Sequence, residues 1–144
     1  MSNNFTTIKS ITDNLQSVLL AIGIKFSRKA FEDAGSIPLS LLPFGEIYYK
    51  GESFEYTHGQ RSGYAEANYL IKVITQGHDN TELVRTAQKW VHGVRDSITI
   101  NALNIGELAT SKLVSWVNME SVEIVYTAEY GTIDYVIKIR YRET

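Results

Sequence analysis

The most constraining feature of the sequence is its final stretch, "VYTAEYGTIDYVIKIRYRE", which alternates apolar and polar side chains from residue 125 to residue 143. Successive side chains of a β-strand point to opposite faces of a sheet, so this two-residue period predicts strands. Tyr130 and Gly131 interrupt the alternation, and glycine supplies the backbone freedom that a tight turn needs. The chain is therefore predicted to end in a β-hairpin with a two-residue turn at Tyr130-Gly131.

This turn would set the pairing of the two arms. The apolar pairs expected on the buried face are Ala128–Ile133, Tyr126–Tyr135, Ile124–Ile137 and Val122–Ile139. Three basic residues share the opposite face: Lys138, Arg140 and Arg142. Glu123 is expected to lie opposite Lys138 and offset its charge. RNA-binding sheets place aromatic side chains beside the basic ones, whereas Tyr135 and Tyr141 alternate away from this basic face. The pattern favours a solvated or subunit-contacting face over a nucleic-acid site.

A second hairpin is predicted earlier in the chain, with arms over about Glu46–Tyr56 and Tyr64–Gln76. The joining segment, Thr57–Gly63, is rich in turn-forming residues. The apolar phase of the first arm changes near Gly51, where a β-bulge would supply the extra residue. One face of the second arm carries Ala65, Ala67, Tyr69, Ile71 and Val73. Because Leu70 and Ile74 lie on its other face, the end of this arm is expected to be covered on both sides.

Two amphipathic helices are predicted. The first has apolar residues at three- and four-residue steps and ends near Gly23; they are Phe5, Ile8, Ile11, Leu15, Val18, Leu19 and Ile22. The second starts after Asp79, which forms a capping arrangement with Glu82. Its expected buried face is formed by Leu83, Ala87, Trp90, Val91, Val94 and Ile98. Residues 24–43 are interpreted as an ordered crossing, Asn101–Lys112 as a connection, and Leu113–Val117 as a further strand.

The order of these elements is helix, two strands, helix, then two or three strands. It predicts a single α+β domain over residues 1–144, in which an antiparallel sheet of long hairpins has two helices packed on one face.

Composition removes several classes of protein. The formal net charge of −2 and the pI near 5.9 argue against a protein that binds nucleic acid through bulk positive charge. A chain without cysteine has neither disulfides nor thiolate metal sites. The N-terminal stretch lacks the features of a signal peptide, and polar residues such as Lys9 and Asp13 interrupt its apolar run. We therefore expect a soluble protein with no membrane partner.

No catalytic, metal or cofactor constellation is recognisable. The histidines, His58, His78 and His92, fall in three different elements, and none belongs to a pair at metal-ligand spacing. The glycines match neither a phosphate loop nor a dinucleotide fingerprint. Three glutamates, Glu46, Glu52 and Glu55, cluster in sequence and leave a carboxylate pair open, although a solvated strand face is much commoner. We expect no catalytic, metal-binding or cofactor-binding residues, and no enzyme.

Tyrosine is concentrated in or beside the two hairpins: Tyr48, Tyr49, Tyr56, Tyr64, Tyr69, Tyr126, Tyr130, Tyr135 and Tyr141. Tyrosine is a good strand former, and it is also enriched at protein interfaces, where one end is buried and the other wet. Both interpretations fit a module that assembles. The residues expected to contact another subunit or a tube are Tyr48, Tyr49, Tyr56, His58, Gln60, Arg61 and Tyr64.

With these elements in place, the chain resembles the tail terminator (tail completion) proteins of long-tailed bacteriophages. The segments that carry the resemblance are "ITDNLQSVLLAIG", "IPLSLLPFGEIYYKGESFEY", "TELVRTAQKWVHGVRDSI" and "SVEIVYTAEYGTIDYVIKIRYRE". The resemblance covers essentially the whole chain and rests on the layout of the elements. It implies a non-enzymatic virion protein of the neck, assembled in the host cytoplasm.

Members of this family form a ring, typically hexameric, that caps the tail tube, ends its polymerisation and presents a surface to the head–tail connector. The implied partners are other copies of the chain, the tail tube protein and the connector protein, with DNA only passing through the ring. Two alternatives remain open at this stage. One is a nucleic-acid-binding module that uses Lys138, Arg140, Arg142 and Arg61. The other is a small enzyme or ligand-binding domain with Glu46, Glu52, Glu55 and His58 beside a cleft.

Overall fold

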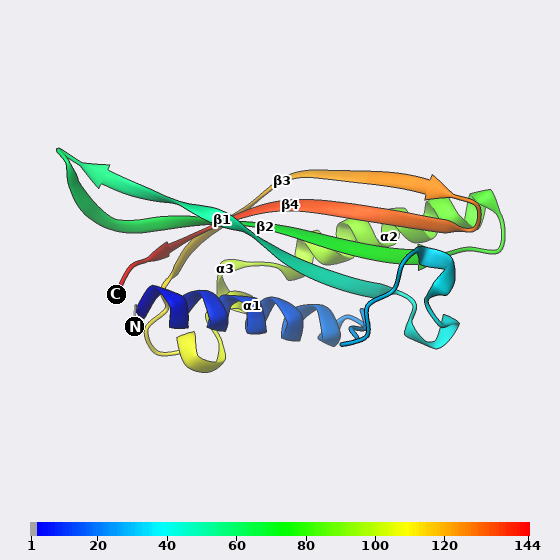
Figure 1. Ribbon diagram of the computed structural model, residues 1–144, viewed down its shortest axis with the longest axis horizontal. Coiled ribbons are helices and arrows are strands. Elements are labelled where there is room, and N and C mark those ends of the chain that lie inside the picture. Colours follow the sequence, from blue (N-terminus) through cyan, green and yellow to red (C-terminus); the bar gives the residue numbers. More distant parts are fainter. Residues whose placement is uncertain (1–2) are drawn as a thin grey trace.

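The computed structural model describes residues 3–144, which form one α+β domain. The predicted order of helix, two strands, helix and two strands is confirmed, and one further short helix follows the second long one. The helices are α1 (Asn3–Ala21), α2 (Asn80–Ser97) and α3 (Ile100–Leu103). The strands are β1 (Phe44–Thr57), β2 (Gln60–Gln76), β3 (Val114–Thr127) and β4 (Tyr130–Arg142) (Figure 1).

The strands form one antiparallel sheet in the order β1-β2-β4-β3. The central strands β2 and β4 join the two hairpins, and they pair without interruption from Tyr64 opposite Arg142 to Gln76 opposite Tyr130. Both edge strands carry two irregularities each; those of β1 lie between Tyr49 and Glu52 and between Phe54 and Tyr56. The sheet therefore has a regular centre, and among the described residues its two outer edges are unpaired except where Lys25 bridges to Phe44 at the start of β1.

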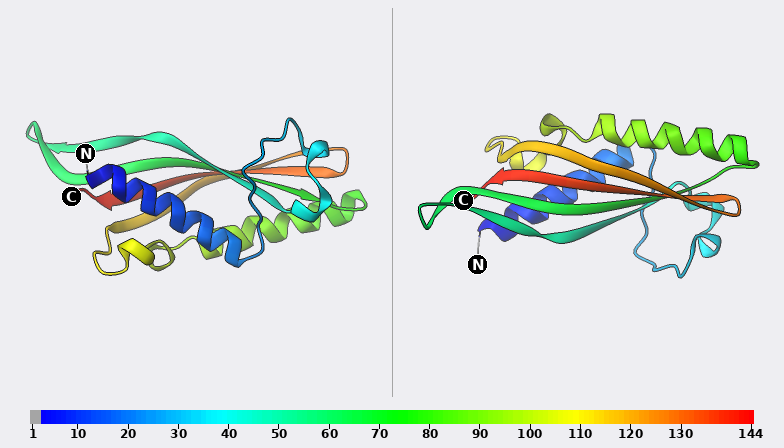
Figure 2. Two further views of the ribbon diagram at one scale, coloured as in Figure 1. Left: turned by 60° about the horizontal axis from the view of Figure 1, so that its bottom comes forward. Right: turned by 90° about the horizontal axis from the view of Figure 1, so that it is seen from above.

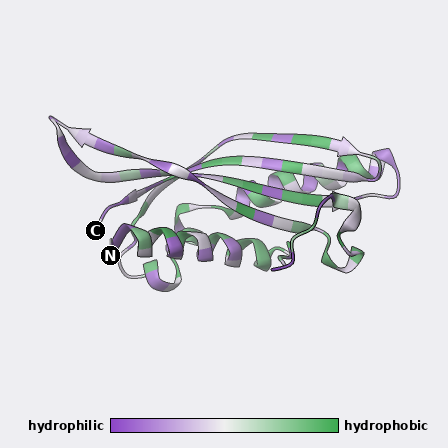
Figure 3. Cartoon of the chain, in the orientation of Figure 1, coloured by the Kyte–Doolittle hydropathy of each residue, from purple (hydrophilic) through white to green (hydrophobic). Residues whose placement is uncertain are grey.

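The main core lies between one face of this sheet and the helices. All five residues predicted for one face of β2 are at most 1% exposed, and they meet Ile133, Tyr135, Ile137, Ile139 and Tyr141 of β4. Ile11, Leu15 and Leu19 of α1 and Ala87 and Val94 of α2 close this core. Both long helices thus cover the same face, as predicted (Figure 2). Hydropathy accordingly alternates along the strands (Figure 3).

Local signals explain where α2 begins. Asp79 has extended backbone angles, and its carboxylate accepts a hydrogen bond from the Glu82 amide at 2.8 Å. The Glu82 carboxylate accepts from the amide of His78 at 3.1 Å, so two amides at the start of the helix gain partners. Gly77 precedes this cap, and a Cβ there would lie only 2.5 Å from the Leu83 backbone nitrogen. The close passage of β2 beneath α2 therefore requires glycine at this position.

The crossing segment forms a smaller core on the opposite face. It contains two short 3₁₀ helices, Ala34–Ser36 and Leu39–Leu41, and it packs Ile37 and Phe31 against Phe44 and Ile74. The rings of Phe31 and Phe44 meet edge to face, with centroids 5.4 Å apart. The end of β2 is therefore covered on both faces, as the sequence predicts.

The first hairpin turn is tighter than predicted. The turn consists of His58 and Gly59 alone, because Thr57 pairs with Gln60 and both strands continue through the expected loop. Both turn residues have positive φ, which histidine tolerates better than most side chains and glycine adopts freely. The predicted bulge at Gly51 is confirmed: its φ is +105°, and the register shifts between Tyr49 and Glu52.

The predicted register of the last hairpin is wrong. The turn is at Ala128-Glu129, so Thr127 faces Tyr130, and Ile124 faces Ile133 instead of Ile137. The faces were nonetheless assigned correctly, because the slip preserves the two-residue period. The strand expected over Leu113–Val117 is the beginning of β3 and not a separate element. Among the described residues, no helix combines the length and apolar content needed to cross a membrane.

Candidate functional site

The β1–β2 hairpin continues past the bulge as a projecting arm, here defined as residues 52–64. It extends beyond the first turn of α1 and beyond the C-terminal end of β4 (Figure 1). Phe54 is 44% exposed and Tyr56 is 62% exposed, although both are large apolar side chains. Exposed aromatic residues on a projecting hairpin are suited to contact with another protein.

Three groups of polar contacts fix the root of this hairpin arm. The Glu52 carboxylate accepts hydrogen bonds from the phenols of Tyr49 and Tyr141. Arg61 forms an ion pair with Glu143 at the C-terminal end of the chain. The same carboxylate oxygen of Glu143 also accepts from the Asn4 side chain of α1, at 2.7 Å. The arm is therefore held by β4 and by Glu143, which is itself bonded to α1.

The third group of contacts is made by Arg140 on the face of the sheet that the long helices leave uncovered. This face is called the open face, and it carries Tyr48, Leu70, Val136, Lys138 and Arg140. Arg140 donates two hydrogen bonds to Glu55, at 2.7 and 3.2 Å, and lies 3.9 Å from the centre of the Tyr64 ring. The Arg140 guanidinium lowers the pKa of Glu55. Arg140 thus links the arm to the body of the sheet through a charge pair and a cation–π contact.

The predicted basic face is largely neutralised. Lys138 lies 3.1 Å from Glu120 and 3.5 Å from Glu66, and its pKa is raised by these carboxylates, chiefly by Glu120. The prediction that Glu123 lies opposite Lys138 is wrong. Glu123 lies opposite Asp134, because the register of the hairpin differs from the predicted one. Arg142 is exposed and has no ion pair among the described residues. The compensated charges leave little cation density to attract a phosphate backbone.

Tyr48 and Tyr49 point to opposite faces, as neighbours in a strand must. The Tyr48 phenol donates to Glu46 on the open face, and this hydrogen bond is the main reason that its pKa rises to about 12. Tyr49 meets the buried Tyr69 on the helix side with ring centroids 5.7 Å apart. The predicted contact residues therefore divide between the tip of the arm, its open face and the helix side of β1.

The carboxylates considered for acid–base chemistry do not converge. Glu46 and Glu55 lie on the open face with different partners, whereas Glu52 is on the helix side of the sheet. His58 is in the exposed turn at the tip of the arm. Across residues 3–144 there is no cluster of three or more histidine, aspartate or glutamate side chains able to hold a metal ion. The geometry supports no catalytic assignment.

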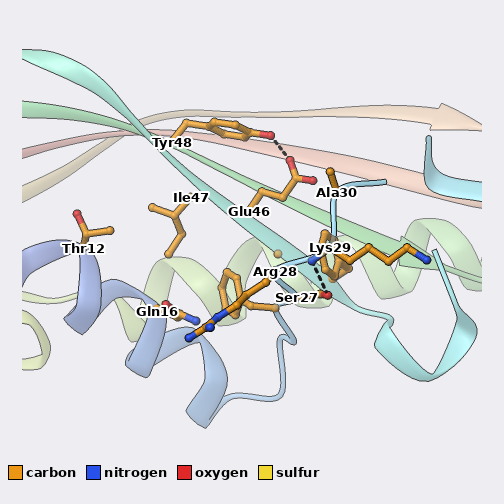
Figure 4. A pocket seen from close by; sticks show the side chains of 12 residues that line it. Thr12, Gln16, Ser27, Arg28, Lys29, Ala30, Glu46, Ile47 and Tyr48 are labelled. Carbon is orange, nitrogen blue, oxygen red and sulfur yellow. Dashed lines mark hydrogen bonds between the residues drawn. The ribbon is translucent and has the colours of Figure 1, made fainter. Parts of the chain in front are cut away.

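A groove of about 650 Å³ runs beside the outer edge of β1 and was not predicted. Its lining comes from α1, from residues 26–30 and from the start of β1 (Figure 4). Arg28 reaches toward Gln16 on one side, and Lys29 extends along the other (Figure 4). In the sequence, the groove is marked only by the neighbouring basic residues Arg28 and Lys29 in the crossing segment. Local sequence patterns could not show that these residues lie beside the edge of β1.

Neither family models nor curated proteins match this chain. Solved structures do match it. One is a chain of the virion of a native gene transfer agent (GTA) particle, with a TM-score of 0.52 and 15% sequence identity. The match covers 92% of this chain and 91% of that chain.

The two chains share a fold. At 15% identity the likeness concerns the arrangement of the elements and assigns no individual residue. The unmatched 8% of a 144-residue chain is about 12 residues, fewer than β2 alone contains, so the shared architecture extends into both hairpins.

Proposed function

We propose that this chain is a structural protein of a virion, and that it forms the neck ring that caps a tail tube. The observation that carries the proposal is the fold shared, over nearly the full length of both chains, with a chain of a gene transfer agent virion. The element order that resembles tail terminator proteins supports the same role. Exposed hairpins and unpaired sheet edges suit a subunit that is completed by its neighbours.

In this role the partners are other copies of the chain, the tail tube protein and the head–tail connector protein. The ring is proposed to be hexameric, with DNA passing through its centre. It would act in the tail neck of a virion assembled in the host cytoplasm. No cofactor or catalytic step is involved.

The hairpin arm is the proposed contact with a neighbouring subunit or with the tube. Its exposed positions include Tyr56, His58, Gln60 and Arg61, and its root is fixed through Glu52 and Glu143. Tyr64 belongs to the base of this arm, and Tyr48 and Tyr49 lie next to the arm on opposite faces of β1. A contact surface anchored at three points loses less conformational freedom on binding than a flexible loop does.

The test measures the length of tail tubes polymerised with and without the protein, by negative-stain microscopy. Wild-type protein is expected to cap tubes and to stop further growth. The double variant Phe54→Ser, Tyr56→Ser is expected to cap poorly, whereas Gln88→Ala on the exposed surface of α2 should cap normally. Tubes that grow equally with and without wild-type protein would contradict the proposal.

A further inference from the structure

The two edges of the sheet differ in how they are protected. After the irregularity between Met119 and Ser121, β3 pairs regularly with β4 from Val122 to Thr127. In this stretch Val125 is 61% exposed and Tyr126 is 45% exposed. Natural edge strands usually carry lysines, prolines or bulges that prevent pairing with another chain. Residues 122–127 contain none of the three and have high β-propensity, so this edge is open to a further strand.

The opposite edge lies in a groove. At the start of β1, Lys25 pairs with the edge: its amide donates to Pro43 at 2.9 Å, and its carbonyl accepts from Gly45 at 2.7 Å. The chain then turns away, and the groove of about 650 Å³ opens beside Glu46–Tyr48. Within the described part of the chain, no strand pairs with this outer side of β1 beyond Gly45. The groove thus has space for an extended segment next to unpaired backbone groups.

Strand direction makes the two edges compatible. Each neighbouring pair in the order β1-β2-β4-β3 is antiparallel, so β1 and β3 run in opposite directions. When β3 of one copy is placed beside β1 of the next, without reversing the copy, the junction is antiparallel too. Repeating the step gives a sheet that alternates through every junction. Such head-to-tail contacts generate a ring when the rotation closes.

Charge favours this arrangement over pairing of β3 with another β3. No lysine or arginine occurs between Lys112 and Lys138, whereas Glu123 and Glu129 lie in or just after β3. Glu120, also in β3, is already paired with Lys138. Two such edges together would bring like charges into contact. The groove carries positive charge, because Arg28 and Lys29 line it. Its one carboxylate, Glu46, already accepts a hydrogen bond from the Tyr48 phenol.

We propose that residues Val122–Thr127 of one copy add as a strand to the β1 edge groove of a second copy, with Arg28 and Lys29 facing the acidic β3 edge. The inference rests on the proposed ring and names the surfaces that build it. The occupant of the groove is therefore a second copy of this chain, and the contact is heterologous.

Cross-linking tests which surfaces meet, and the absence of native cysteine allows single-cysteine variants. Lys29→Cys and Glu123→Cys both replace exposed side chains, so both proteins should fold. With a short bismaleimide linker, a mixture of the two is expected to give cross-linked dimers, whereas each variant alone gives none. Dimers formed by Glu123→Cys alone would show β3–β3 pairing and overturn the inference.

Charge exchange gives an independent readout by native mass spectrometry. The double variant Arg28→Glu, Lys29→Glu is expected to raise the concentration at half-assembly by about tenfold, since like charges then oppose one another. Adding Glu123→Lys to it should recover much of the loss. If wild-type rings form but the double variant assembles equally well, the proposed surfaces are wrong while the ring proposal stands. If wild type forms no oligomer in solution or on tail tubes, the ring proposal falls, and this inference falls with it.

Discussion

The two faces of β4 place neighbouring residues in contrasting environments. Tyr135, Ile137 and Ile139 are fully buried under the helices, whereas Val136, between the first two, is 38% exposed on the open face. Apolar burial is the main favourable term in folding, so the covered face determines the stability of the domain. Away from the smaller core under the crossing segment, the open face contributes mainly exposed charge pairs, which add little to stability. The contrast indicates that the open face and the sheet edges can change, or bind partners, without loss of the fold.

The largest effect is expected from truncation on the covered face. Ile137→Ala should lower the free energy of unfolding by about 2–5 kcal/mol, because it removes buried methyl groups and leaves a cavity. Val136→Ala, one residue away on the open face, should cost less than about 1 kcal/mol. Urea unfolding followed by circular dichroism measures both. Similar costs for the two variants would mean that the open face is also buried, and the comparison between the faces would fail.

The pKa values of Tyr69 and Tyr48 are raised for different reasons on the two faces, and titration can distinguish these reasons. Burial raises the pKa of Tyr69 to about 12, whereas a hydrogen bond to Glu46 is the main cause of the same rise at Tyr48. Glu46→Gln should therefore move the Tyr48 pKa back toward its ordinary value of 10.0 and leave that of Tyr69 unchanged. NMR titration of ring carbons would show this. Equal shifts at both tyrosines would contradict the assignment of causes.

Stability should also fall at high pH. The folded-state pKa of Tyr69 lies above its unfolded value of 10.0, so its contribution to stability is complete below pH 10. That contribution is lost as the pH rises from 10 through about 12. Thermal unfolding at pH 9, 10 and 11 should show a progressive decrease in Tm. A Tm that is constant or rises over this range would contradict the burial of the Tyr69 phenol.

The smallest effect is expected from the pair of Arg140 and Glu55 on the open face. Glu55→Gln should change the free energy of unfolding only slightly, because exposed charge pairs are screened by solvent. The pKa of Glu55 is lowered in the folded state, so the contribution of the pair is present above the ordinary value of 4.5 and lost as pH falls further. The difference between wild type and variant should therefore vanish in strong acid. A difference that grows there would show that another group is responsible.

The strands and their faces could be predicted, because the two-residue alternation of apolar and polar side chains indicates which face is buried. Tyr69, Ile71, Ile137 and Ile139 lie on the predicted covered face even where the register was wrong. The N-terminus of α2 could be predicted as well, because Asp79 provides the capping interaction through its own side chain. These features depend on residues that are close in sequence.

The turns could not be placed because their residues are unusual for the conformations they adopt. Ala128 has φ of +51°, a region that alanine rarely occupies, while Gly131 lies inside β4 opposite Tyr126. Choosing the glycine therefore placed the turn two residues too late. The β1 edge groove joins α1, the crossing segment and β1, which are distant in sequence. Contacts of this kind depend on the three-dimensional arrangement and leave no local pattern.

The most direct test of ring formation through the β3 edge is native mass spectrometry of wild type and of Val125→Lys over a series of concentrations, with Tm measured on the same samples. Val125 lies in the edge strand β3, and its side chain is 61% exposed. A lysine there should prevent pairing with a further strand without disturbing the core under the helices. We expect one closed oligomer for wild type and a monomer for the variant, whose Tm should equal that of wild type at concentrations low enough for the oligomer to dissociate. A variant that forms the same oligomer as wild type, or a wild type that stays monomeric at every concentration and on tail tubes, would contradict this expectation.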